Sequence, residues 1–357
     1  MQAAVLEGID SLHIRNVPDP VLEDEYSLIL KVHACAVCGS DIRILHHGNP
    51  RVVPPQIIGH EIAGEVVAVG SKVTRFQLGD RLATGADVPC GECAWCRDGL
   101  ANNCAINYAI GYQFPGGFAE YVQLNALTLR TGAVHHIPES LSYAQATLAE
   151  PLGCCINGAE QSHIRPGSTV VVIGAGPAGC MLMRLARNLG ALKVIAIQRS
   201  RGRLEAAERI GGADLVICSL DQDPVQAVLD ATQGEGADVV ITAASSIDTH
   251  RLAFQIVRNR ATINLFGGLP SDAPPLDVAS NIIHYKELTV TGSHGSVDRH
   301  HRLALEYLAT RTIDPDDYIT HHFSLDEIDL AIRAAEGHDG MKAIVYPHGL
   351  PPEARRR

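Results

Sequence analysis

The 357-residue chain contains few aromatic residues, which make up 4% of the sequence and include a single tryptophan. It also lacks long hydrophobic runs, since no apolar stretch approaches the ~20 residues that a membrane-spanning helix needs. The N-terminus has no charged start followed by an apolar core, so we predict no secretion signal. The lack of long apolar runs argues against membrane-spanning helices, and without a secretion signal we expect a cytoplasmic protein.

Basic residues are scarcer than acidic ones: 29 lysines and arginines face 40 aspartates and glutamates, a formal net charge of −11. A general nucleic-acid-binding protein would carry a basic face, so we expect no nucleic-acid partner. The ten cysteines favour metal ligands and buried thiols over disulfides, because no export signal accompanies them. The length allows two domains, each with its own core.

The middle of the chain predicts a strand, a glycine-rich turn and a helix in direct succession. The β-branched run Thr169–Ile173 leads into Gly-x-Gly-x-x-Gly at Gly174, Gly176 and Gly179. In a dinucleotide-binding fold, these glycines allow a tight turn, the approach of a pyrophosphate and close packing of helix on strand. The N-terminus of the helix then offers free N–H groups to phosphate. The predicted apolar face of this helix comprises Leu182, Leu185, Ala186 and Leu189.

A βα rhythm continues after this turn and gives the strand count of a full dinucleotide-binding fold. The six predicted strands are Val170–Ile173, Val194–Ile197, Leu215–Ile217, Val239–Thr242, Ile263–Phe266 and Leu288–Thr291. Helical patterns such as Leu204–Ile210 and Val225–Ala231 separate the earlier ones. Residues 1–35 instead read as several short strands, so the fold class is α/β with a β-rich first domain.

Four cysteines close together predict a structural zinc site. Cys90, Cys93, Cys96 and Cys104 have Cys-x2-Cys-x2-Cys-x7-Cys spacing. Four thiolates around one tetrahedral ion leave no position for a substrate, so such a site is structural. The alternative of a nucleic-acid-binding zinc module is disfavoured because no basic stripe accompanies the cysteines.

A second set of ligand types precedes the four cysteines. Cys38 stands two residues before Ser40, and His60 is followed by Glu61. A thiolate, an imidazole and a carboxylate are ligands of a catalytic zinc that keeps one position open. Each of these residues alone could have a purely structural role. An isolated cysteine is usually a small core residue, and a His-Glu pair usually lies in a polar loop.

The order of these motifs, with Glu150-Pro-Leu between them and the glycine turn, resembles the zinc-dependent medium-chain dehydrogenases over nearly the whole chain. Glu150 is similar to the residue of the sorbitol and threonine dehydrogenase branch at this point. The resemblance implies a GroES-like catalytic domain plus a doubly wound Rossmann domain. It also implies a homodimer or homotetramer, and the two separate ligand sets predict two zinc ions per chain.

From this resemblance we predict three segments. Residues 1–153 form the catalytic domain, with the structural zinc lobe at about 88–106. Residues 154–291 form the cofactor-binding domain, and residues 292–357 return to the catalytic domain.

The implied activity is hydride transfer between a secondary alcohol and NAD(P), which yields a ketone. Cys38 and His60 would bind the catalytic zinc together with Glu61 or Glu150, and Ser40 would accept the alcohol proton. The substrate would be a polyol, a cyclitol or aminocyclitol, or an amino alcohol. The alternatives are a zinc-free quinone or enoyl reductase on the same fold, and a non-catalytic relative.

The sequence departs from the family pattern at Arg43, where many relatives have a histidine as the outer station of the proton relay. Arginine does not release its proton near neutral pH. Either His46 or His47 substitutes, or water completes the path, or Arg43 binds an anion instead. The sequence does not decide between these.

Cofactor preference is predicted from the end of the second strand, where Gln198 replaces the carboxylate that commonly binds the ribose of NAD. No charge there repels a 2′-phosphate, and cations follow directly, so we predict NADP over NAD. The alternative is a solvated basic loop with Gln198 bonded to the ribose of NAD. The predicted cofactor-binding residues are Gly174, Gly176, Pro177, Ala178, Gly179, Gln198, Arg199, Ser200, Arg203 and Gly267.

Overall fold

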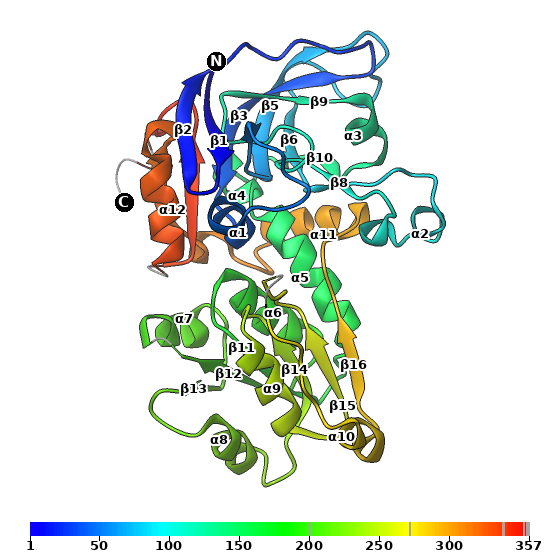
Figure 1. The fold of residues 1–357 in the computed structure, drawn as a ribbon, viewed down its shortest axis with the longest axis vertical. Coiled ribbons are helices and arrows are strands. Elements are labelled where there is room, and N and C mark those ends of the chain that lie inside the picture. Colours follow the sequence, from blue (N-terminus) through cyan, green and yellow to red (C-terminus); the bar gives the residue numbers. More distant parts are fainter. Residues whose placement is uncertain (200, 271–272, 338–339, 353, 355–357) are drawn as a thin grey trace. The chain divides into compact units, whose positions relative to one another are not determined.

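The computed structural model describes residues 1–357 except 200, 271–272, 338–339, 353 and 355–357. The chain divides into two compact units. Unit 1 consists of Met1–Gly153 and Gly295–Arg357, and unit 2 consists of Cys154–His294. Unit 1 is therefore built from both ends of the chain, and Figure 1 shows its first strands in blue and its last helix in orange.

Unit 1 is rich in short strands. Its strands are β1 (Gln2–Gly8), β2 (Ser11–Asn16), β3 (Leu28–Ala36), β4 (Gln56–Ile57), β5 (Glu61–Val69), β6 (Arg81–Thr84), β7 (Asp87–Val88), β8 (Tyr108–Ala109), β9 (Tyr121–Leu124), β10 (Val134–His136), β17 (Ile319–Ser324) and β18 (Lys342–Tyr346). Its α-helices are α1 (Gly39–His47), α2 (Ala94–Arg97), α3 (Ala126–Thr131), α4 (Tyr143–Ala146), α11 (Asp298–Ala309) and α12 (Ile328–Glu336). The boundary between the units falls within α5 (Ala149–Gln161).

The main sheet of unit 1 brings distant segments together. Its strand order is β10-β6-β5-β3-β18-β17, and β9 also pairs with β3. The C-terminal strand β18 is buried along its whole length and pairs with β3 through Ile344 and Val345. This pairing places the end of the chain beside the segment that carries the first predicted zinc ligand.

Unit 2 alternates strands and helices. Its strands are β11 (Thr169–Ile173), β12 (Lys193–Gln198), β13 (Leu215–Cys218), β14 (Ala237–Thr242), β15 (Val257–Leu265) and β16 (Thr289–Gly292). Its α-helices are α6 (Pro177–Asn188), α7 (Leu204–Arg209), α8 (Pro224–Ala231), α9 (Ile247–Gln255) and α10 (Ser280–Lys286).

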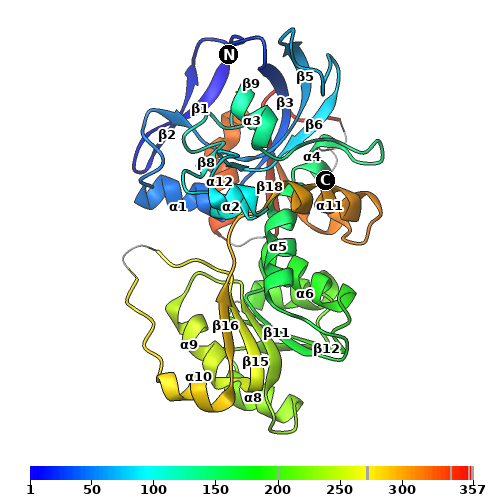
Figure 2. The same cartoon turned by 90° about the vertical axis from the view of Figure 1, so that its right-hand side faces the viewer.

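The strands of unit 2 form one parallel sheet in the order β13-β12-β11-β14-β15-β16. In chain order this is 3-2-1-4-5-6, the order of a doubly wound dinucleotide-binding fold. Figure 2 shows α6 and α9 on opposite sides of the sheet. The predicted fold class is confirmed, and the order reverses between β11 and β14, where such folds bind their ligands.

Two predicted elements differ in extent from the observed ones. β15 begins at Val257, earlier than the apolar run Ile263–Phe266 suggests, because its first half carries exposed polar side chains that hide the strand pattern. The helix α6 ends at Asn188, so Leu189 lies beyond it and is 43% exposed instead of completing the apolar face. The three other predicted face residues are buried.

Across the part of the chain that the structure describes, none of the helices combines the length and the apolar character needed to cross a lipid bilayer.

Candidate active site

Cys38 is held at the start of α1 by its own helix. The residue has extended backbone angles, and its N–H donates to the Oδ2 of Asp41 at 2.9 Å. The Asp41 side chain is completely buried. This bond fixes the backbone that carries the Cys38 thiol at the turn from β3 into α1.

His60 is placed by the glycine that precedes it. Gly59 has a φ of +91°, and a Cβ there would stand 2.9 Å from the ring of Phe118. A side chain at this position would therefore be strained and would also collide. The chain turns tightly at Gly59, and His60, which is 4% exposed, points into the interior before β5 begins.

The imidazole of His60 lies between a carboxylate and a hydroxyl. Its Nδ1 is 3.3 Å from the Oδ1 of Asp41, and its Nε2 is 3.3 Å from the Oγ of Ser40. Burial lowers the pKa of His60, but Asp41 and Cys38 outweigh it and raise that pKa well above the usual value. A carboxylate beside Nδ1 favours the tautomer whose Nε2 lone pair is available to a metal ion.

Glu61 is paired with a lysine from the far end of the chain. Both carboxylate oxygens of Glu61 bind the Nζ of Lys342, the longer bond being 2.6 Å, and both residues are buried. Lys342 also donates to the carbonyl oxygen of Val37 at 3.2 Å. The pKa of Lys342 is raised despite its burial because the Glu61 carboxylate stabilises the ammonium. Lys342 therefore competes with any metal ion for Glu61.

Glu150 lies in the first turn of α5 and is 7% exposed. The pKa of its carboxyl is raised to about 7, chiefly by burial; His60 lowers this pKa, and Cys38 and Asp87 raise it. The position of Glu150 thus lets its charge interact with Cys38 and His60. Its carboxylate does not belong to the close group described next.

Cys38, His60 and Glu61 fit a metal ion. One ligand atom of each lies within 4.8 Å of the other two. A thiolate, an imidazole and a carboxylate are the mixed ligand set of catalytic zinc sites, which keep one position open. The structure therefore brings together four predicted residues: Cys38, Ser40, His60 and Glu61. Glu150 is buried and interacts electrostatically with Cys38 and His60, but it lies outside this group.

The four lobe cysteines fit a second ion. Their sulfur atoms lie within 4.8 Å of one another, with Cys93 to Cys96 at 3.5 Å and Cys90 to Cys96 at 3.9 Å. Zinc–sulfur bonds of ~2.3 Å in a tetrahedron imply sulfur separations of about 3.8 Å. Backbone N–H groups of Ala105 and Cys96 lower the pKa of Cys93 to about 6, which favours the thiolate form that binds zinc.

The glycine turn after β11 has the predicted close contacts. A Cβ on Gly179 would stand 1.9 Å from the carbonyl oxygen of Gly174, so no larger residue fits there. Pro177 is the first residue of α6, and Gly176 precedes it as the N-cap without a side-chain bond. Free N–H groups at this helix start can bind an anion such as a pyrophosphate.

Two of the predicted side chains pack directly on this turn. The Oε1 of Gln198 accepts a bond from the N–H of Ala175 at 2.8 Å. The Nη1 of Arg203 lies 2.7 Å from the point where a Cβ of Gly176 would stand, and burial lowers the pKa of this guanidinium. Arg199 is exposed, and Ser200 lies outside the described residues.

The other predicted cofactor residues lie at the same sheet edge. Ala178 is in the first turn of α6 and accepts a weak bond from the Cys155 thiol at 3.6 Å. Gly267 follows β15, and its N–H donates to the carbonyl oxygen of Thr242 at 2.6 Å.

Three residues of the site were missed in the sequence. Asp41 supports both Cys38 and His60, and its signal was a carboxylate three residues after the cysteine. Tyr112 places its ring 5.9 Å from that of His60, and burial raises the pKa of its phenol. Lys342 is a charged residue at the start of an otherwise apolar strand pattern.

The two histidines proposed to replace the relay at Arg43 differ in their surroundings. Both ring nitrogens of His46 bind carboxylates, Nδ1 that of Asp10 and Nε2 that of Glu336. These carboxylates, Asp10 foremost, raise the pKa of His46. Both histidines are exposed, but His46 links α1 to the turn that follows β1 and to α12.

We expect His46→Gln to lower the melting temperature more at pH 6 than at pH 9. The folded-state pKa of His46 is raised, so its stabilising effect is complete below the unfolded pKa and disappears as the pH rises through the folded value. Thermal unfolding at both pH values measures the difference, and His47→Gln serves as the matched control. An equal loss at both pH values would contradict the charge assignment.

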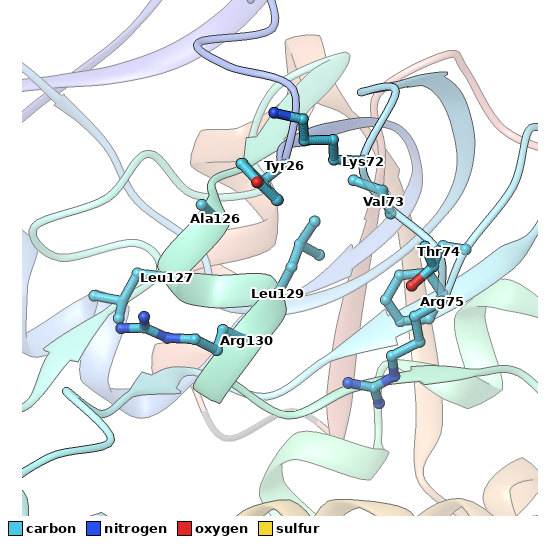
Figure 3. Close-up of a pocket in the computed structure, with 10 residues that line it drawn as sticks. Tyr26, Lys72, Val73, Thr74, Arg75, Ala126, Leu127, Leu129 and Arg130 are labelled. Carbon is cyan, nitrogen blue, oxygen red and sulfur yellow. The ribbon is translucent and has the colours of Figure 1, made fainter.

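A cavity of about 610 Å³ lies elsewhere in unit 1, between α3 and the segment before β6 (Figure 3). Its lining includes apolar side chains such as Leu129 and Val73 and the cations Lys72, Arg75 and Arg130. None of its lining residues is a cysteine, a histidine or a carboxylate, so it is separate from the metal-ligand groups.

Comparison with known proteins agrees with the geometry. Residues 24–139 match the family model of the alcohol dehydrogenase GroES-like domain, and residues 177–310 match that of the zinc-binding dehydrogenase. The chain is 31% identical over 354 residues to the sorbitol dehydrogenase of Bacillus subtilis (strain 168), with 98% of each chain covered. The chain belongs to the zinc-dependent medium-chain dehydrogenases.

Further relatives of this medium-chain dehydrogenase support the predicted branch of sorbitol and threonine dehydrogenases. The chain is 29% identical to D-xylulose reductase A of Aspergillus oryzae (strain RIB 40). The matched region covers 96% of this chain and 95% of that relative. A solved structure from Sinorhizobium meliloti 1021, described as a zinc-binding dehydrogenase bound to NADP, has a TM-score of 0.88 and 32% identity over 97% of this chain and 99% of that one. The predicted class, an oxidoreductase of alcohol dehydrogenase type, is confirmed.

Proposed function

We propose that this dehydrogenase oxidises a polyol, a cyclitol or aminocyclitol, or an amino alcohol to the ketone with NADP, using a zinc ion at Cys38 and His60. The observation that carries the proposal is the close group of Cys38, His60 and Glu61, in which Cys38 is half-buried and the other two residues are buried. The names of the relatives, among them a sorbitol dehydrogenase and a galactitol-1-phosphate dehydrogenase, favour polyhydroxylated substrates.

The residues around the proposed zinc site would have different roles in the reaction. When bound, the zinc supplies a Lewis acid for the alcohol oxygen and the nicotinamide supplies the hydride acceptor. The Asp41 carboxylate lies beside the Nδ1 of His60, so the Nε2 of that ring would be the nitrogen that binds the ion. Ser40, whose Oγ is next to that Nε2, is placed to receive the hydroxyl proton of the substrate.

The third protein ligand is proposed to be Glu61 or Glu150. Glu61 belongs to the close group with Cys38 and His60, but Lys342 binds both of its carboxylate oxygens. Glu150 has a raised pKa and is placed to hold the ion or a water molecule when Glu61 stays with Lys342.

The proposed cofactor-binding surface in unit 2 uses the glycine turn for the pyrophosphate. Arg203 lies against Gly176 and would neutralise phosphate charge there. Gln198 brings no negative charge to the end of β12, and the exposed Arg199 follows it. These features support NADP over NAD, because arginine binds phosphate groups well.

We also propose that the protein is a homodimer or homotetramer. β16 is the end strand of its sheet among the described residues, and its Val290 is 38% exposed. An edge strand of this kind offers unpaired backbone groups to a second copy.

Replacing Cys96 with serine is expected to remove one zinc ion per chain and to lower the melting temperature. The four sulfurs would close around a structural ion, whose binding energy contributes to folding. Metal analysis and thermal unfolding measure both effects, while turnover of the protein that stays folded should change less. An unchanged zinc content would contradict the assignment of the lobe.

The proposed function is tested by initial rates on a panel of polyols, cyclitols and amino alcohols with NADP and NAD, followed by nicotinamide absorbance. Turnover of at least one panel class is the expected result. No turnover of any class, in either direction, would contradict the proposal.

A further inference from the structure

A buried histidine of α9 holds the turn that follows β15. His250 is 5% exposed, and its Nε2 is 3.1 Å from the carbonyl oxygen of Gly267. A carbonyl oxygen only accepts hydrogen bonds, so this nitrogen must carry the proton and donate it. The ring of His250 thus fixes one carbonyl of the Gly267-Gly268 turn.

The same turn is held against the end of β14. Its Gly267 N–H donates to the carbonyl of Thr242, and a Cβ on Gly267 would stand 2.7 Å from the carbonyl oxygen of Ala244. The Thr242 hydroxyl is buried and has no hydrogen-bond partner among the described residues. A buried hydroxyl without a hydrogen-bond partner lowers stability, so the Thr242 hydroxyl is available to a polar group of a ligand.

The sheet order indicates which half of the cofactor would lie at Thr242 and Gly267. β12, whose Gln198 would lie at the adenosine ribose, is on one side of β11, and β14 and β15 are on the other. The glycine turn after β11 would bind the pyrophosphate between them. A dinucleotide that crosses this edge therefore places its nicotinamide half towards Thr242 and Gly267.

We propose that His250 is a positioning residue for the nicotinamide half of the cofactor. Two successive glycines would otherwise leave the turn with many backbone conformations, and ordering them at the moment of binding costs free energy. The His250 bond orders the Gly267 carbonyl in advance, which improves affinity by preorganisation. The inference rests on the proposed NADP-dependent function.

The test compares NADPH with 2′,5′-ADP, which carries only the adenosine half. Both are titrated against the full-length wild type, His250→Ala and His250→Gln. We expect His250→Ala to bind NADPH about five- to tenfold more weakly, which is the loss of one hydrogen bond, and to bind 2′,5′-ADP unchanged. Glutamine presents an N–H at a similar distance from the backbone and should restore most of the affinity.

The control is Thr232→Val at the opposite edge of the same sheet. The Thr232 hydroxyl donates to Val228 at 2.7 Å and accepts from Gly236 at 2.9 Å, so its loss should lower the melting temperature without changing either affinity. If His250→Ala weakens both ligands equally or leaves NADPH binding unchanged, the inference is overturned. NADH and AMP form the corresponding pair for the other cofactor, and a wild type that binds none of the four refutes the proposed function instead.

Discussion

Cys38→Ser is expected to reduce turnover by at least about a thousandfold while the protein stays folded, since a Lewis-acid metal contributes several kcal/mol to transition-state stabilisation. The Cys38 thiol is one of the three closely grouped ligand atoms, and serine is a poor zinc ligand of similar size. The backbone bond from Cys38 to Asp41 does not involve the sulfur, so α1 should keep its start. Initial rates, zinc content and circular dichroism of the purified variant measure the outcome.

Cys35→Ala is the matched control for this substitution. Its thiol is also buried at the end of β3 but belongs to neither metal-ligand group. Loss of this thiol should cost stability through lost packing and leave the zinc content unchanged. A Cys38→Ser protein that retains normal turnover would remove Cys38 from the chemistry.

Gln198→Glu is expected to lower the ratio of kcat/KM for NADP to that for NAD by about a hundredfold. The two side chains have the same shape, and a glutamate oxygen can still accept the N–H of Ala175. The new charge would repel a 2′-phosphate and bind the ribose hydroxyls of NAD. Charged hydrogen bonds contribute about 1.5–3 kcal/mol each, and 1.4 kcal/mol corresponds to tenfold.

Two arginine variants separate the contributions to this ratio. Arg199→Ala should weaken NADP selectively, because the residue follows the ribose-binding position. Arg203→Ala should weaken both cofactors, because its guanidinium lies on Gly176 at the pyrophosphate turn. A wild type that prefers NAD, or a ratio that does not move in Gln198→Glu, would contradict the NADP preference.

Local patterns were sufficient to predict much of this protein. The apolar β-branched runs and the glycine turn after Ile173 gave the parallel sheet, because a buried strand and its turn are encoded by adjacent residues. The four lobe cysteines were recognisable for the same reason, because they are closely spaced in the sequence. Cys38 and His60 are separated in the sequence, and their proximity was predicted from the family resemblance.

Contacts between distant segments were not predictable in this way. Lys342 pairs with Glu61 although 281 residues separate them in the sequence, and no residue near Glu61 indicates this ion pair. His46 appeared as a free relay candidate, but its two carboxylates come from a β-turn and from α12. Gln198 is predicted to bind the cofactor, and the bond from its oxygen to the glycine turn could not be read from the sequence. Each of these depends on how the chain packs.

Zinc removal and restoration in the purified enzyme tests the central claim most directly. Chelation should strip the open Cys38 and His60 site before the closed four-cysteine lobe, so turnover should fall in proportion to the first zinc lost and return when zinc is added back. This result would also exclude the zinc-free reductase alternative. Turnover that persists undiminished after the open site has lost its zinc would contradict the account.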